Sequence, residues 1–157
     1  MSDKILEVSD LQIRYVTDEE TVRAVNGVSF TLERGESIGL VGETGAGKTT
    51  TALGIMGLVP DPPGEIVGGS ILFEDQDLLK LPEKQMREIR GGKISMIFQD
   101  PMTSLNPVMT VGAQIAEVVL LHNKISKAEA RERAKEMLEQ VGIPGARCDD
   151  YPHQFSG

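Results

Sequence analysis

The feature that most constrains the fold is the segment 42–49, GETGAGKT. It matches the pattern Gly-x-x-x-x-Gly-Lys-Ser/Thr, in which a glycine-rich loop joins a strand to a helix and holds phosphate groups. An apolar run at 37–41 precedes it, and a helix-compatible run at 50–56 follows it. The sequence therefore predicts an α/β domain with a phosphate-binding loop.

Each residue type in this loop has a physical role. Glycines at 42, 45 and 47 can adopt positive φ, so that successive N–H groups converge on phosphate oxygens at the positive end of the following helix. Lys48 is predicted to reach the terminal phosphates, and the Thr49 hydroxyl is predicted to ligate Mg²⁺. The candidate loop contacts to nucleotide are Gly42, Glu43, Thr44, Gly45, Ala46, Gly47, Lys48, Thr49 and Thr50. A glycine-rich turn without a ligand is the alternative interpretation, and the flanking runs argue against it.

Composition narrows the possible partners and compartment. Lys plus Arg number 16 and Asp plus Glu number 24, which gives a net charge of −8. This charge argues against nucleic-acid binding, because a phosphate backbone requires a basic face. The single cysteine, Cys148, cannot form an internal disulfide, and no apolar stretch approaches the ~18 residues of a membrane span. We therefore expect a cytoplasmic protein.

Patterning predicts strands mainly in the first half of the chain. The runs 5–15 and 22–32 alternate in part and are separated by a charged turn, whereas 37–41 and 93–98 are nearly continuous apolar runs typical of strands buried on both faces. The run 66–74 is predicted to form a strand pair or hairpin that bends at Gly68-Gly69.

The second half is predicted to be helical. Ser126 and Glu129 form a capping-box signature, and Gly142 with Pro144 ends the helix that follows. The apolar positions expected to face a core are Val111, Ile115, Val118 and Val119 in one helix and Ala130, Ala134, Met137, Leu138 and Val141 in the next.

Three further features identify a family resemblance. Tyr15 lies ahead of the loop, where it can stack on an adenine ring; Gln99 follows the run 93–98; and the chain closes with 151–157, YPHQFSG. With the loop, these resemble the ATP-binding subunit of an ABC transporter over essentially the whole chain. The segment 97–107, IFQDPMTSLNP, is similar to that of oligopeptide, dipeptide and nickel importers.

The resemblance implies roles for individual residues. Tyr15 would stack on adenine, and Gln99 would sense the γ-phosphate and Mg²⁺, so that Lys48 and Gln99 are the candidate catalytic residues and Thr49 and Gln99 the metal ligands. Ser156 and Gly157 would begin the signature that contacts ATP on a second copy.

Some of these residues also have simpler interpretations. Tyr15 could be an ordinary strand aromatic, and Gln99 an ordinary polar residue at a strand end. His153 is expected to be part of the approach to the signature rather than a catalytic base, and Cys148 a structural thiol.

The implied fold is α/β, a P-loop NTPase of ABC type with an antiparallel β-subdomain, a partial core sheet and a partial helical subdomain. A β-subdomain with the loop core would span 1–99, and the Gln99 loop with the helical subdomain 100–157. The subunit would lie on the inner face of the membrane, where its hydrolysis of ATP would drive peptide uptake. The implied partners are permease subunits, reached through the loop after Gln99, a second ATP-binding subunit and, indirectly, an extracytoplasmic solute-binding protein.

The resemblance also implies elements beyond residue 157, namely the rest of the signature, a Walker B strand ending in Asp-Glu and a switch histidine. We therefore expect no ATP turnover by residues 1–157 alone, and bare edges on the strands predicted at 37–41 and 93–98. A catalytically incompetent nucleotide-binding or interaction fragment is the alternative function. A kinase or GTPase is a third, although the sequence contains no Asn-Lys-x-Asp motif.

Overall fold

The computed structural model describes residues 3–99 and 104–155. Contacts between residues divide the chain into two compact units, Met1–Arg90 and Gly91–Gly157. Among the described residues, no helix has both the length and the apolar character that crossing a membrane requires.

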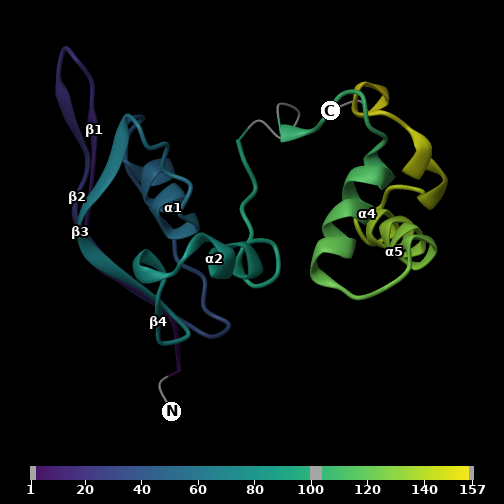
Figure 1. Ribbon diagram of the computed structural model, residues 1–157, viewed down its shortest axis with the longest axis horizontal. Coiled ribbons are helices and arrows are strands. Elements are labelled where there is room, and N and C mark those ends of the chain that lie inside the picture. The colour runs from purple at the N-terminus through teal and green to yellow at the C-terminus, as the bar shows by residue number, and fades with distance from the viewer. Residues whose placement is uncertain (1–2, 100–103, 156–157) are drawn as a thin grey trace. The chain divides into compact units, whose positions relative to one another are not determined.

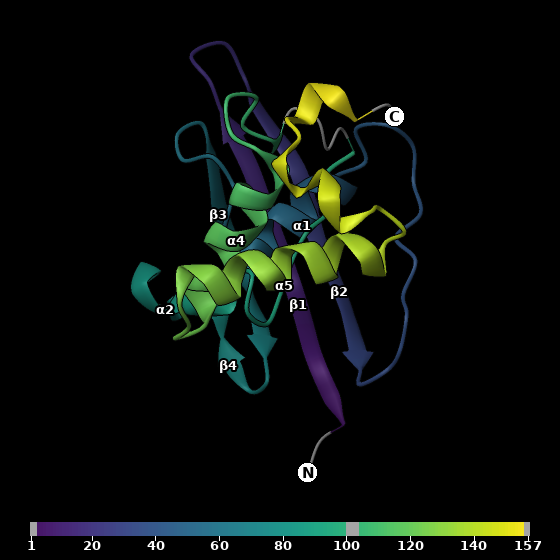
Figure 2. The ribbon, with the colours of Figure 1, turned by 90° about the vertical axis from the view of Figure 1, so that its right-hand side faces the viewer.

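The first unit is built on a four-stranded sheet with strand order β2-β1-β3-β4, in which every neighbouring pair is antiparallel (Figures 1 and 2). Its strands are β1 (Lys4–Val16), β2 (Thr21–Glu33), β3 (Gly64–Phe73) and the short β4 (Gln76–Asp77). The first two strands confirm the prediction from the alternating runs. They form a long hairpin, to which β3 adds on the other side of β1.

The predicted bend at Gly68-Gly69 is wrong, because β3 runs through these residues as one strand. The pairing of β1 with β3 shifts in register between Ser9 and Gln12, and Gly69 has φ +93°. A Cβ on Gly69 would lie 2.5 Å from the carbonyl oxygen of Asp10. The glycine therefore permits a bulge and a close approach of two backbones rather than a turn.

Three helical segments complete the first unit: α1 (Lys48–Met56), the 3₁₀ turn η1 (Leu78–Lys80) and α2 (Glu83–Ile89). Figure 1 shows α1 and α2 on the same side of the sheet. Gly54 brings α1 so close to β1 that a Cβ there would lie 2.8 Å from the Ile13 side chain. The core joins sheet and helices through Val8, Leu11, Ile13, Val25, Ile71, Phe73, Thr51, Met56, Leu78, Met86 and Ile89.

The two predicted doubly buried strands, 37–41 and 93–98, do not form. Neither run is a strand in the structure, and Val41 and Ile97 are 97% and 92% exposed. A strand requires a neighbour that accepts and donates its backbone hydrogen bonds. Within the part of the chain that the structure describes, neither run joins a sheet: the run 93–98 makes only an isolated bridge at Ile94, whose carbonyl accepts from the Gly91 amide, and the only sheet is the antiparallel one.

The second unit consists of helices. The helix α4 (Val111–His122) packs against α5 (Lys127–Gln140), and the 3₁₀ turns η2 (Gly145–Asp149) and η3 (Pro152–Gln154) follow. The predicted capping box is confirmed, since the Glu129 amide donates to Ser126 Oγ and the Ser126 amide donates to Glu129 Oε2.

The core of the second unit is formed by Ala134, Leu138 and Cys148, against which Val111, Ile115, Ala116 and Ile143 pack. Ala130 and Val119 are also buried. The expectation that Val118, Met137 and Val141 face the core is wrong, because they are 50%, 48% and 72% exposed. The buried stripe of α5 is narrower than the apolar pattern: only Ala130, Ala134 and Leu138 are buried, and Val141 is the C-cap residue, beyond the end of the helix.

Candidate nucleotide site

The segment 42–49 forms a compact loop that leads directly into α1. Gly45 and Gly47 have φ values of +85° and +81°, in the left-handed region that glycine adopts without strain. The Ala46 amide donates to the Glu43 carbonyl over 3.1 Å, which tightens the turn. Gly47 is the N-cap residue, so the helix begins at Lys48, two residues before the run 50–56 that the sequence predicts.

The end of the loop is fixed on both sides of Gly47. Its carbonyl oxygen accepts hydrogen bonds of 2.8 Å from both the amide and the buried hydroxyl of Thr51. On the other side, a Cβ at this position would lie 2.1 Å from the carbonyl oxygen of Ala24 on β2. The start of α1 is therefore held against the sheet, and its free N–H groups point away from the helix body.

The side chain of Lys48 bends back into the loop. Its ammonium donates to the carbonyl oxygens of Gly42, at 2.5 Å, and Glu43, at 2.7 Å. The loop thus curls around a positive charge at the positive end of a helix that has no acidic residue in its first turn. This arrangement attracts an anion with several oxygens, which could replace the two carbonyls as partners of the ammonium.

The other candidates in the first unit lie on the same sheet-and-helix framework. Thr49 is exposed on the first turn of α1, and Thr50 is half-buried. Tyr15 is half-buried on β1, where it pairs with Val22 and Gly64, and its ring edge lies 2.7 Å from the position of a Cβ on Gly64. The stacking of Tyr15 on adenine stays a prediction.

The remaining candidates belong to the second unit. Gln99 is exposed, and its approach to the loop stays a prediction. Ser156 and Gly157 lie outside the described residues, as does the segment 100–103 that follows Gln99. His153 stacks on Tyr151 with ring centroids 5.9 Å apart.

The second unit contains a buried thiol. Burial raises the pKa of the Cys148 thiol, which is 2% exposed, as expected for a structural thiol. A Cβ on Gly112 would lie only 1.9 Å from its sulfur atom, so α4 and η2 meet at this point. Within the described residues, no group of three or more acidic, histidine or cysteine side chains could hold a metal ion.

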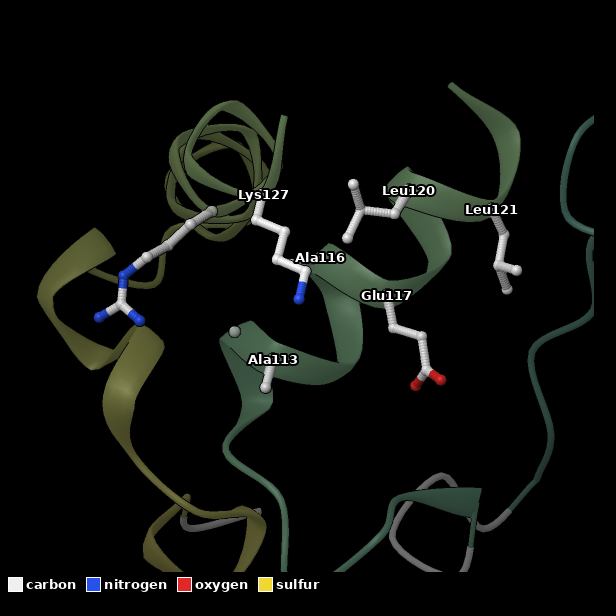
Figure 3. Close-up of a pocket in the computed structure, with 8 residues that line it drawn as sticks. Ala113, Ala116, Glu117, Leu120, Leu121 and Lys127 are labelled. Carbon is white, nitrogen blue, oxygen red and sulfur yellow. The ribbon is translucent and has the colours of Figure 1, made fainter. Parts of the chain in front are cut away.

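An open groove of about 530 Å³ lies between α4 and α5. Its floor is apolar and includes Ala116 and Leu120, with Glu117 and Lys127 among its polar members. Figure 3 shows the Lys127 ammonium above the surface of α4 and the Glu117 carboxylate pointing away from it. None of the candidate nucleotide-binding residues lines this groove.

Arg90, in the first unit, supports α1 and was not predicted from the sequence. Arg90 donates to the carbonyl oxygens of Met56 and Gly57, at the far end of α1. Its position beside Gly91-Gly92 offered only a turn signal, and the partner carbonyls are more than 30 residues away in sequence. No periodic pattern could have revealed such a contact.

Comparison with known proteins identifies relatives of the chain. The chain is 51% identical over 158 residues to the "Probable peptide ABC transporter ATP-binding protein y4tR" of Sinorhizobium fredii, covering 99% of the chain and 47% of that protein. It is 53% identical over 156 residues to the "Oligopeptide transport ATP-binding protein OppD" of Bacillus subtilis, covering 98% of the chain and 44% of that protein. The chain spans about half the length of these curated relatives.

A solved structure shares the fold. The "Dimeric structure of a post-hydrolysis state of the ATP-binding cassette MJ0796 bound to ADP and Pi" superimposes with a TM-score of 0.83 at 23% identity, covering 96% of the chain and 63% of that structure's chain. The predicted α/β fold, a P-loop NTPase of ABC type, is thereby confirmed. Residues 25–157 match the family described as ABC transporter, and the chain belongs to this family.

Proposed function

We propose that the chain is the nucleotide-binding part of an ATP-binding subunit that couples ATP binding and hydrolysis to peptide uptake by an ABC importer. The observation that carries the proposal is the loop 42–49, closed around the Lys48 ammonium at the start of α1. Relatives at about half identity are described as peptide and oligopeptide transport ATP-binding proteins, which supports the choice of solute.

The chemistry of the loop begins with an exchange of hydrogen-bond partners. Lys48 leaves the Gly42 and Glu43 carbonyls and donates to the terminal phosphate oxygens of ATP, while the loop amides and the N-terminus of α1 bind the remaining oxygens. Gly47 stays fixed by Thr51, so the amides do not have to reorganise as the anion binds.

A divalent cation fits the oxygen donors that this chain presents. The exposed Thr49 hydroxyl at the start of α1 and the Gln99 side-chain carbonyl are the ligands we propose, because Mg²⁺ prefers oxygen ligands and retains several waters. When bound, Mg²⁺ supplies charge neutralisation at the terminal phosphates. Tyr15 would hold the adenine ring by stacking.

The proposed partners follow from the family. A second ATP-binding subunit would supply its signature to the nucleotide of this one, with Ser156 and Gly157 serving its partner in return. The loop after Gln99 would contact permease subunits at the inner face of the membrane, and a solute-binding protein would deliver peptide on the other side. Hydrolysis is proposed for the complete subunit.

Calorimetric titration with ATP and Mg²⁺ tests the nucleotide site. The Lys48→Ala variant should bind ATP at least about tenfold more weakly, because a charge-assisted hydrogen bond contributes roughly 1.5–3 kcal/mol. Lys84→Ala, which removes an exposed lysine of α2, is the matched control and should bind like the unaltered chain. Equal affinity of all three proteins would refute the proposed role of Lys48. If GTP competes for the site more strongly than ATP in a binding assay, a GTPase would be favoured instead.

A further inference from the structure

We propose that Arg90 is a positioning residue for the nucleotide site, which it supports by holding the C-terminal end of α1. This inference rests on the proposed function, because it concerns how well the start of the same helix receives phosphate. Arg90 itself touches the helix at the opposite end, so its role is to fix geometry rather than to contact nucleotide.

The guanidinium of Arg90, the C-cap residue of α2, joins the end of α1 to α2 through four hydrogen bonds. Nε donates to the Met56 carbonyl at 2.7 Å, and Nη2 donates to the Gly57 carbonyl at 2.9 Å. Toward α2, Nη1 donates to Glu83 Oε1 at 2.8 Å and Nη2 donates to Glu83 Oε2 at 3.2 Å. The two-pronged contact with the carboxylate fixes the plane of the guanidinium.

The last turn of α1 depends on this contact for positive charge. The helix has no basic residue in that turn, and its final carbonyls carry the negative end of the helix dipole. Arg90 supplies the charge from outside the helix, with a side chain that is only 19% exposed. Partial burial makes the contact stronger than a surface ion pair.

The backbone beside the guanidinium is shaped to admit it. Gly57 ends α1 with φ +60°, and a Cβ at this position would lie 2.9 Å from Arg90 Nη2 and 3.4 Å from Met86 Cε. A glycine here therefore serves both the left-handed helix end and the close approach of the arginine.

The helix α1 is short enough to transmit this constraint. Its nine residues span roughly 13 Å at about 1.5 Å per residue. Gly47 is held against β2 at the start, and Gly54 in the last turn packs on Ile13. Without Arg90 the carbonyls of Met56 and Gly57 lose their side-chain donors, so the end of the helix beyond Gly54 can fray and the helix can tilt, which moves the loop amides away from the phosphate oxygens.

The experiment compares variants at Arg90 with one matched control. Arg87 bonds to the same Glu83 carboxylate at 3.3 Å, but it is 75% exposed and lies one turn away from the α1 contact. Arg87→Ala therefore removes a cation from the same carboxylate without touching the carbonyls of α1. Arg90→Lys keeps the charge but loses the planar contacts of the guanidinium. This second variant tests the inference if Arg90→Ala does not fold.

Two readouts are measured on each variant: ATP affinity by calorimetry, and hydrogen exchange of amides 48–56 and 127–140. We expect Arg90→Ala to bind ATP about five- to tenfold more weakly, with faster exchange in 48–56 alone, and Arg90→Lys to recover part of both. Arg87→Ala should bind within about twofold of the unaltered chain.

Two outcomes would overturn the inference: unchanged ATP affinity in both Arg90 variants, or equal acceleration of exchange in the two helices. If the unaltered chain does not bind ATP, the proposed function fails on its own. The exchange in 48–56 then still decides whether Arg90 holds α1.

Discussion

Alanine at Gly47 and alanine at Gly45 should have different costs, although the two glycines have nearly the same backbone conformation. Their φ values are +81° and +85°, so either substitution places a side chain in the left-handed region, at about 1–2 kcal/mol. At Gly45 nothing lies within 4 Å of the new Cβ, whereas at Gly47 the Ala24 carbonyl oxygen lies at 2.1 Å. Relief of that overlap adds roughly 1–3 kcal/mol, which gives a total of about 2–5 kcal/mol at Gly47.

Urea denaturation followed by circular dichroism measures this difference in the free energy of unfolding. Gly45→Ala should fall within about 2 kcal/mol of the unaltered chain, and Gly47→Ala should be less stable than Gly45→Ala by at least about 1 kcal/mol. Gly47→Ala should also lose ATP binding, because the start of α1 must move off β2. Equal free energies for the two variants would refute the argument that the sheet holds the loop.

Three further predictions concern the helical unit. Ser126→Ala removes the hydroxyl that caps α5, and should lower the free energy of unfolding by about 1 kcal/mol in urea denaturation. The bond from the Ser126 amide holds the pKa of Glu129 below its usual range. The ionised Glu129 carboxylate therefore stabilises the folded chain fully above the pKa of a free glutamate, roughly 4.3, and this stabilisation is lost as the pH falls through the lowered pKa. Glu129→Gln should flatten this part of a stability-against-pH curve, and an unchanged curve would contradict the assignment. Gly112→Ala should lower the free energy of unfolding of this unit by at least about 1 kcal/mol, because the new Cβ would overlap Cys148. Thermal unfolding measures this loss, and an unchanged transition would show that α4 and η2 can separate freely.

Local sequence signals were sufficient where the partner lies nearby in the chain. The phosphate loop, the hairpin of β1 and β2, and the capping box at Ser126 each depend on residues within a short span. The family resemblance and the ABC-type fold were predicted from such motifs and are confirmed by the comparisons. The roles of Tyr15 and Gln99 stay predictions, since no contact of either with nucleotide is shown.

Elements that depend on distant partners were not predictable in this way. The run 37–41 has the composition of a buried strand, but composition does not supply the neighbour that a ladder requires. Gly69 has the sequence signal of a turn residue, but its conformation is set by the backbone of β1, which passes directly beside it at Asp10. The short α2 and the Arg90 contact gave no signal, because α2 has only seven residues and the arginine bonds to carbonyls of another segment.

The packing of Cys148 against Gly112 gives the helical unit a reporter of its own. The chain contains one cysteine, and its thiol becomes reachable by a small alkylating reagent only when α4 and η2 part. The labelling rate should therefore follow the opening of this unit and be insensitive to events confined to the sheet and the phosphate loop. The single native thiol thus allows the opening of one unit to be timed without introducing a probe.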